Sequence, residues 1–486
     1  MKSPLFLLAV STVSLSFIPA HADPPPRAHV GPTTQHIVRW APEWYIGTDY
    51  MTSGQYWTGD WGSGAWLGLR PYLIDKGVEI TGSYANNIQG NVVGGTSLGA
   101  AYDHNVGMQM DLNLEKLIGW NDAHFVISAL DRTGRNLSQD SIGNQFTVSQ
   151  LWGNPTFVFY GLYLDQDLFN GKANIRLGRI AAGDEFASSP VYWLYVNNGI
   201  CGNPQSLPVN ASFTSYPNAT WGARLRVQPT PEVYFQTGIY QATDRLGNPK
   251  YHGIDFSIRP NDGFSTVAQI GWKPEFNKQE VPESTPDVGK DIADKASRFG
   301  QAAREGKTVT SKNPVKQKKL AGLPGHYWLG AYWSNWEYSQ FTGGDAYQNA
   351  YGFYIHADQM VYQERPGSSE GLTLWSGLTY SPQQQISKLP LLINGGMFYT
   401  GLIPTRDTDQ TIFGVVYGKF SGDYAQSQRQ AGLGSPSYEL VFEWAYRLHL
   451  TPFLYIQPDI QWVIRPGGTG DIPNALVLGG QMGVNF

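Results

Sequence analysis

The chain has 486 residues, of which 14% are aromatic and only 15% are charged, and 56 are glycine. A net charge of −5 gives no basis for nucleic acid as a partner, and a lone cysteine, Cys201, excludes an internal disulfide framework. Many aromatic residues, much glycine and few charges are typical of many strands joined by tight turns.

The first residues predict export. Lys2 precedes an apolar stretch that begins at Leu5, and Ala20-His21-Ala22 has the A-x-A form of a cleavage site. We therefore expect residues 1–22 to be a cleaved signal peptide. Beyond them, no apolar run reaches the roughly 18 to 20 residues that a membrane helix needs.

Residues 23–76 are expected to form a short periplasmic segment, proline-rich at first and with a helical pattern around Leu69, Leu73 and Ile74. From residue 77 to 486 the pattern is strand, turn, strand. Sixteen candidate strands begin near Val78, Val106, Ala123, Thr156, Ala173, Ala219, Glu232, Ser265, Tyr327, Tyr351, Leu372, Leu391, Thr411, Glu439, Tyr455 and Ala475.

Apolar residues occupy every second position of several candidate strands, most clearly in 440–450, 456–465 and 476–486. The alternate row carries charged, polar or small residues. Two arrangements produce this pattern: a soluble sandwich with the apolar row inward, or a barrel in lipid with that row outward. The export signal and the terminal Phe486 favour an all-β, transmembrane, antiparallel up-and-down β-barrel of about sixteen strands.

If the last strand ends in the periplasm, the connections alternate backward from it. The longer connections then lie outside the cell, among them 88–103, 132–155, 181–217 and 243–262. The lysine-rich segment 276–324 falls in the periplasm. It is either a solvated insertion or a contact with peptidoglycan or a periplasmic partner.

The long loop 181–217 either covers the mouth of the barrel or folds into its interior. Fixed charges and aromatic faces across a narrow gap suit a sugar, because hydroxyl groups bond to the charges and C–H faces stack on the rings. The alternative is that the arginines pair with neighbours and stiffen the wall. The predicted pore-lining residues are Arg176, Arg179, Asp184, Glu185, Tyr192, Trp193, Arg224, Arg226, Glu443, Arg447 and Asp459. Strict alternation from Arg176 turns Arg179 outward unless a bulge intervenes.

No motif predicts catalysis, a metal or another cofactor. Gly95-Thr96-Ser97-Leu98-Gly99 matches a nucleophile elbow, but it joins two strands where an elbow needs a helix after it. H-E-x-x-H, C-x-x-C and phosphate-binding loops are not found in the sequence.

Several short motifs resemble the OprB-type carbohydrate-selective porins of Gram-negative outer membranes. They are Gly59-Asp60-Trp61-Gly62, Leu69-Arg70-Pro71-Tyr72-Leu73, Leu177-Gly178-Arg179, Leu323-Pro324-Gly325, Ala357-Asp358-Gln359, Gln457-Pro458-Asp459 and Arg465-Pro466-Gly467-Gly468. The resemblance implies a monomeric barrel of sixteen strands in the outer membrane, surrounded by lipid and lipopolysaccharide. It also implies facilitated diffusion of monosaccharides and related small polyols.

Other functions remain open at this point. A general, non-selective porin would share every one of these features. A barrel enzyme would need a convergent set of catalytic groups at the rim, and a secreted β-rich carbohydrate-binding protein would share the signal peptide and the aromatic residues.

Overall fold

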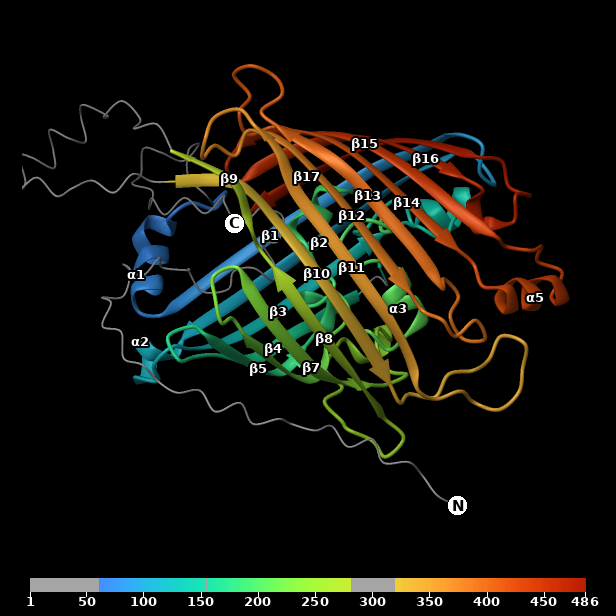
Figure 1. Cartoon of the computed structure of the whole chain (residues 1–486), viewed down its shortest axis with the longest axis horizontal. Helices are drawn as coiled ribbons and strands as arrows, with labels where there is room; N and C mark the ends of the chain where they lie inside the picture. The colour runs from blue at the N-terminus through green and yellow to red at the C-terminus, as the bar shows by residue number, and fades with distance from the viewer. Residues whose placement is uncertain (1–60, 154–155, 281–319) are drawn as a thin grey trace, which may run out of the picture.

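The computed structural model describes residues 61–153, 156–280 and 320–486, and Figure 1 shows them as one twisted antiparallel sheet. The strands in these residues are β1 Val78–Val93, β2 Gly99–Asn113, β3 Ala123–Gly134, β4 Thr156–Leu168, β5 Ala173–Ile180, β6 Thr220–Val227, β7 Val233–Ala242, β8 Gly263–Trp272, β9 Glu275–Glu280, β10 Leu320–Ser334, β11 Ala350–Gln363, β12 Gly371–Tyr380, β13 Leu391–Thr400, β14 Gln410–Lys419, β15 Tyr438–Thr451, β16 Leu454–Ile464 and β17 Ala475–Asn485.

The sheet closes on itself. β1 pairs with β2 on one side and with β17 on the other, and β8 pairs directly with β10. The short strand β9 pairs only with the beginning of β10, from Leu320 to Pro324. Sixteen strands therefore form the closed wall, which confirms the predicted up-and-down barrel, and closure leaves no unpaired sheet edge.

The apolar rows face outward, as predicted. Trp444, Trp462 and Leu478 are 41%, 45% and 44% exposed on the outer surface. On the same strands Glu443, Gln461 and other alternate residues are buried inside. An apolar outer face around a closed sheet is the arrangement that lets strands span a lipid bilayer, since all backbone groups are paired within the wall.

The two ends of the barrel differ in their connections. Long loops and the helix α5 Gly422–Gln430 lie at one end, on the right of Figure 1, while α1, α2 and β9 lie at the other. The remaining helical segments are η4 Trp66–Gly68, α1 Leu69–Asp75, α2 Leu114–Ile118, η5 Ser138–Ile142, η6 Ala182–Asp184, η7 Pro190–Leu194, α3 Ser206–Asn210, η8 Pro249–Tyr251 and η9 Pro466–Gly468. Within the described ranges, no helix is long and apolar enough to cross a membrane.

The predicted loop 88–103 is much shorter in the structure. β1 continues to Val93 and β2 begins at Gly99, well before the expected start near Val106. The glycines and short polar side chains of this stretch suggested a loop, but both long strands stay paired from Val78 to Asn91. Pairing with a neighbouring strand outweighed local propensity here.

The N-terminal segment packs onto the end of the barrel opposite the long loops, which we call the short-turn end. The Gly62 amide donates to the Asn485 carbonyl at 2.7 Å. The Arg70 guanidinium lies over the rings of Trp61 and Trp66, at 4.4 and 4.8 Å from their centroids. Helix α1, which contains Arg70, confirms the predicted helical pattern. The predicted signal peptide lies outside the described residues.

The lysine-rich insertion 276–324 begins and ends as a strand pair. Phe276 and Leu323 are partners in the register between β9 and β10, so the hairpin extends the wall at the short-turn end. Residues 281–319 lie outside the described residues. The proposed contact of this segment with peptidoglycan stays a prediction.

Replacing an outward residue with arginine should destabilise the barrel according to its depth in the lipid. Ile460 and Leu450 are similarly exposed, at 44% and 49%, but Ile460 lies in mid-strand and Leu450 next to a turn. We expect Ile460→Arg to lower the free energy of unfolding by roughly 2–4 kcal/mol and Leu450→Arg by roughly 0–1 kcal/mol. Guanidinium unfolding in lipid vesicles measures both values, and equal losses would contradict a lipid-facing row.

Candidate functional site: a loop folded into the barrel

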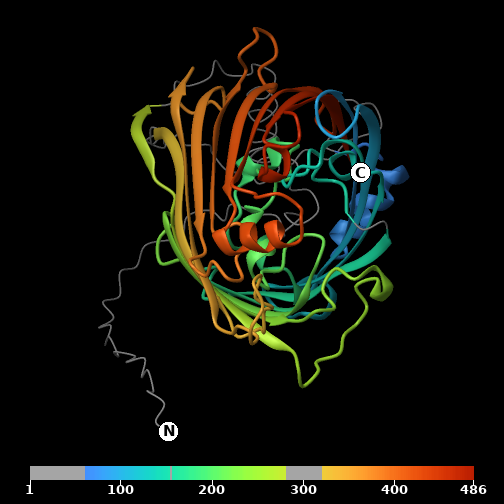
Figure 2. The same ribbon diagram turned by 90° about the vertical axis from the view of Figure 1, so that its right-hand side faces the viewer.

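The loop between β5 and β6, residues 181–219, folds into the barrel. Figure 2 shows this green segment inside the ring of strands. Its large side chains are almost completely buried against the inner wall: Phe186, Tyr192, Leu194, Tyr195, Ile200 and Leu207. We call residues 181–219 the inner loop. Because it packs an apolar cluster against the inner wall, only part of the interior is a polar surface.

Two carboxylates of β15 hold the backbones of different loops. Glu443 accepts hydrogen bonds from the amides of Val196 and Asn197, at 2.7 and 3.0 Å. Four residues earlier on the same inward row, Glu439 accepts from the amides of Gln145 and Phe146, both at 2.7 Å. A carboxylate that accepts two backbone amides satisfies donors that would otherwise be buried without partners.

An aromatic cluster fixes the inner loop to the opposite wall. The hydroxyl of Tyr192 lies 2.8 Å from Nδ1 of His356. The imidazole of His356 stacks on Trp328 with 4.8 Å between centroids, and on its other side it lies 6.1 Å from Trp375. The indole N–H of Trp375 donates to the hydroxyl of Tyr195 at 2.7 Å. Polar contacts at the ends of the rings thus set the position of the loop.

The predicted arginines of β5 and β6 meet a carboxylate of the inner loop. Arg176 forms ion pairs with Asp165 and Glu185, and Arg224 lies 3.4 Å from Glu185. The side chain of Asn174 donates to Asp165. Arg176 and Arg224 are 2% and 4% exposed. Their charges are therefore neutralised beneath the loop, as the wall-stiffening alternative expects.

Other predicted residues lie along the same interior. Asp184 accepts a hydrogen bond from the Tyr160 hydroxyl at 2.6 Å. Arg447 donates to the carbonyl of Trp193 at 2.9 Å. Asp459 accepts from Gln461 at 2.8 Å. Each of these contacts links the wall to the loop or to its own strand.

Arg226 and Trp193, like Glu185, are partly exposed, whereas the other predicted residues are buried. The Arg226 guanidinium lies 4.4 Å from the centroid of the Tyr234 ring. The hydroxyl of Tyr234 in turn contacts His326 at 2.9 Å. Glu185 is taken up by its ion pairs with Arg176 and Arg224, so Arg226 and Trp193 are the partly exposed side chains that we consider for contact with a solute.

Arg179 does not line the interior. It shares its row with Leu177, which is 47% exposed outside, and no register shift separates them from β6. Its guanidinium donates to the carbonyls of Asp255 and Ala219, at 3.0 and 2.8 Å. It is buried because the loop between β7 and β8 covers it. Strict alternation, without a bulge, decides its direction.

Three important groups were absent from the predicted set: Asp165, His356 and Glu439. Asp165 and Glu439 lie on inward rows, so alternation would have found them had every inward charge been considered. His356 gave no signal, because its role depends on rings from separate strands. Within the described ranges, no cluster of three or more His, Cys, Asp or Glu residues could hold a metal ion.

The loop between β7 and β8, residues 243–262, is the outer loop. It is held by Arg245, whose guanidinium pairs with Asp255 at 2.8 Å and with Asp262 at 2.9 Å. Burial alone would raise the pKa of Asp262, but hydrogen bonds from Arg245 and the Arg259 amide outweigh it and place the pKa well below its usual range. Hydrogen bonds from Ser257 likewise lower the pKa of Asp255.

Removal of the Glu443 carboxylate should release the inner loop. Val196 and Asn197 then lose their acceptor, and hydrogen exchange of residues 192–201 should become at least severalfold faster in Glu443→Ala, because two hydrogen bonds together contribute about 1–3 kcal/mol. The matched control is Glu439→Ala, which should accelerate exchange at Gln145 and Phe146 instead. Identical exchange patterns in the two variants would contradict separate anchoring.

The outer loop should resist mild acid. Since the pKa values of Asp255 and Asp262 are lowered by folding, their contribution is complete above the ordinary value of about 3.9 and is lost only as pH falls through the lower folded values. Hydrogen exchange of residues 245–262, corrected for intrinsic rates, should be unchanged between pH 7 and about pH 4. The variant Asp262→Asn should open the loop at pH 7, and opening of the unmodified loop at pH 5 to 6 would refute this assignment.

Comparison with known proteins agrees with this architecture. The chain is 24% identical to Porin B of Pseudomonas aeruginosa, with 86% of this chain and 90% of that protein covered. It is 21% identical to the putative porin QuiX of Acinetobacter baylyi, with 91% and 97% covered. The high-pH structure of Pseudomonas putida OprB superimposes with a TM-score of 0.75 at 23% identity, covering 89% of this chain and 100% of that one.

The family description "Carbohydrate-selective porin, OprB family" matches residues 97–486, which is most of the chain. This match confirms the resemblance seen in the short motifs. Members of this family are channels of the Gram-negative outer membrane and not enzymes, so the long-loop end of the barrel faces the cell exterior. The chain belongs to the OprB family of carbohydrate-selective porins.

Proposed function

We propose that this porin passes neutral monosaccharides and small polyols by facilitated diffusion, through a channel narrowed by the inner loop. The observation that carries the proposal is the pairing of charges beside that loop. Arg176 and Arg224 are both matched by carboxylates, so these buried charges add little net charge to the channel wall there. Such a surface favours an uncharged, hydroxyl-rich solute over an ion.

Trp193 and Arg226 are the proposed contacts for the permeating sugar. An indole face suits the C–H face of a sugar ring, and a guanidinium donates to hydroxyl groups in a fixed geometry. Within the described residues, Arg226 has no carboxylate within ion-pair distance, so its donors remain available. Weak binding at a few such groups speeds passage, whereas strong binding would stall it.

Single channels in planar bilayers test the proposal. Glucose or sorbitol added to either side should reduce the ionic current, and Trp193→Ala should weaken this block roughly three- to tenfold, since one ring contact contributes about 1 kcal/mol. The control is Trp444→Ala, which removes an indole from the lipid-facing row. Currents that no sugar affects would leave a general, non-selective porin in place of a selective one.

A further inference from the structure

The outer loop covers a part of the wall where the edge of β4 has no neighbouring strand. β5 and β6 have only eight residues each, whereas β4 continues beyond β5 to Thr156. The exposed edge of β4 is paired by the outer loop, whose His252 carbonyl accepts a hydrogen bond from the Phe159 amide at 2.9 Å. Gly253 makes this approach possible, since it has φ +70° and a Cβ there would lie 2.2 Å from the Phe159 carbonyl oxygen.

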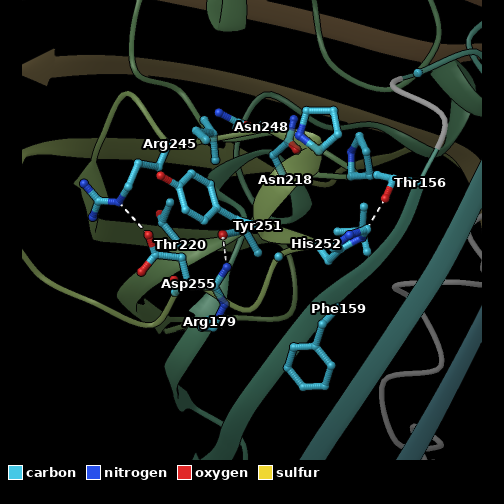
Figure 3. Close-up of a pocket in the computed structure, with 18 of the residues that line it drawn as sticks. Thr156, Phe159, Arg179, Asn218, Thr220, Arg245, Asn248, Tyr251, His252 and Asp255 are labelled. Carbon is cyan, nitrogen blue, oxygen red and sulfur yellow. Dashed lines mark hydrogen bonds and ion pairs between the residues drawn. The ribbon is translucent and has the colours of Figure 1, made fainter.

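A cavity of about 410 Å³ lies between this loop, β4 and the start of β6. Its volume is within the range of small-molecule sites. Figure 3 shows Asn218, Thr220, Asn248 and Tyr251 among the residues around it, with Thr156 and His252 at one side. These residues come from both loops and from the wall, at the end of the channel that faces the cell exterior.

Two side chains around this cavity carry a polar atom that has no hydrogen-bond partner among the described residues. The hydroxyl of Thr220 and Nε of Arg179 are both buried without a hydrogen bond, and their side chains are 3% and 5% exposed. Such groups cost stability unless something in the cavity satisfies them. A hydroxyl group is suited to both, because it accepts from the N–H of arginine and donates to the oxygen of threonine.

The cations around the cavity are already occupied. The guanidinium of Arg132 donates to the carbonyls of Gln150, Leu151 and Trp152. Arg245 pairs with two carboxylates, and Arg179 uses its terminal nitrogens on two carbonyls. An anion would find the guanidinium termini of Arg179 and Arg245 already engaged. The amides of Asn218 and Asn248 and the ring of Tyr251 instead suit an uncharged ligand.

We propose that this cavity is an entry site that binds a neutral monosaccharide or small polyol before it reaches the inner loop. The proposal rests on the proposed passage of neutral sugars and adds a second, separate site to it. Bound sugar hydroxyls satisfy Thr220 and Arg179, the Asn218 amide bonds a further hydroxyl, and the Tyr251 ring covers a C–H face. The site raises the rate at which sugar enters from outside.

Current-noise analysis with oriented channels tests the entry site. With glucose on the exterior side, the double variant Asn218→Ala/Thr220→Val should lower the association rate roughly five- to 150-fold, which corresponds to two lost hydrogen bonds. With glucose on the periplasmic side the rate should not change. The control Gln426→Ala removes an exposed amide from α5 at the same end of the barrel and should have no effect.

A second variant tests the entry site independently, in case the double variant does not fold. Asn248→Cys in a Cys201→Ser background, labelled with a bulky thiol reagent, should fill the cavity and reproduce the exterior-side defect, while unlabelled channels behave normally. Heat-dependent electrophoretic mobility confirms that each variant is folded.

The outcomes separate the two proposals. If glucose never blocks the unmodified channel, the proposed function fails, and the entry site with it. If glucose blocks the variants as it blocks the parent, the cavity holds only water and the entry site is refuted while the proposed function stands. If gluconate associates faster than glucose and the double variant slows it equally, the cavity selects anions and the neutral class is wrong.

Discussion

One requirement determines much of this structure: backbone N–H and C=O groups that are shielded from water need hydrogen-bond partners within the protein. In the wall the requirement is met by pairing every strand with two neighbours and joining β1 to β17. The same requirement applies to the loops inside, where irregular backbone has few partners of its own. The side chains of the inward row supply them: Glu439 and Glu443 to amides, and Arg447 to a carbonyl.

Because inward side chains serve as hydrogen-bond partners for the loops, the interior is rich in ionisable groups that are nevertheless buried. Arg176, Arg447 and Glu443 are at most 2% exposed, and their neighbours are loop backbone or opposite charges. They hold the inner loop in place beside the channel, while partly exposed side chains such as Trp193 and Arg226 are the proposed contacts for the solute. A count of charges on inward rows would therefore overestimate the electrostatic field in the channel.

The barrel could be predicted from the sequence because its determinants are local. Period-two alternation in strands such as 456–465 assigns each side chain to a face. The prediction that Arg179 lines the pore was wrong because it needed a bulge, and no register shift separates β5 from β6. The inner loop was different. Its length predicted that it either covers the mouth or folds into the interior. The sequence could not identify its contacts, because the partners of Tyr192 and Val196 lie on β11 and β15, more than 160 residues away.

The same limit applied to the cavity under the outer loop. Asn218 and Asn248 belong to two connections separated by a strand pair, Thr220 begins β6, and no spacing in the sequence relates the three. Their meeting depends on β5 and β6 being shorter than β4, which becomes visible only when strand ends are known to a residue. Strand ends are the least certain part of any pattern-based prediction.

The spacing of Glu439 and Glu443 has a consequence for assembly. A slip of β15 by two residues along its neighbours would keep every apolar side chain toward the lipid, so the outer surface would not detect the mistake. Inside, however, both carboxylates would move by about 7 Å and lose their amides together. The two loops that bond to Glu439 and Glu443 thus favour the native alignment of β15. A misaligned wall would lose these internal hydrogen bonds although its outer surface is unchanged.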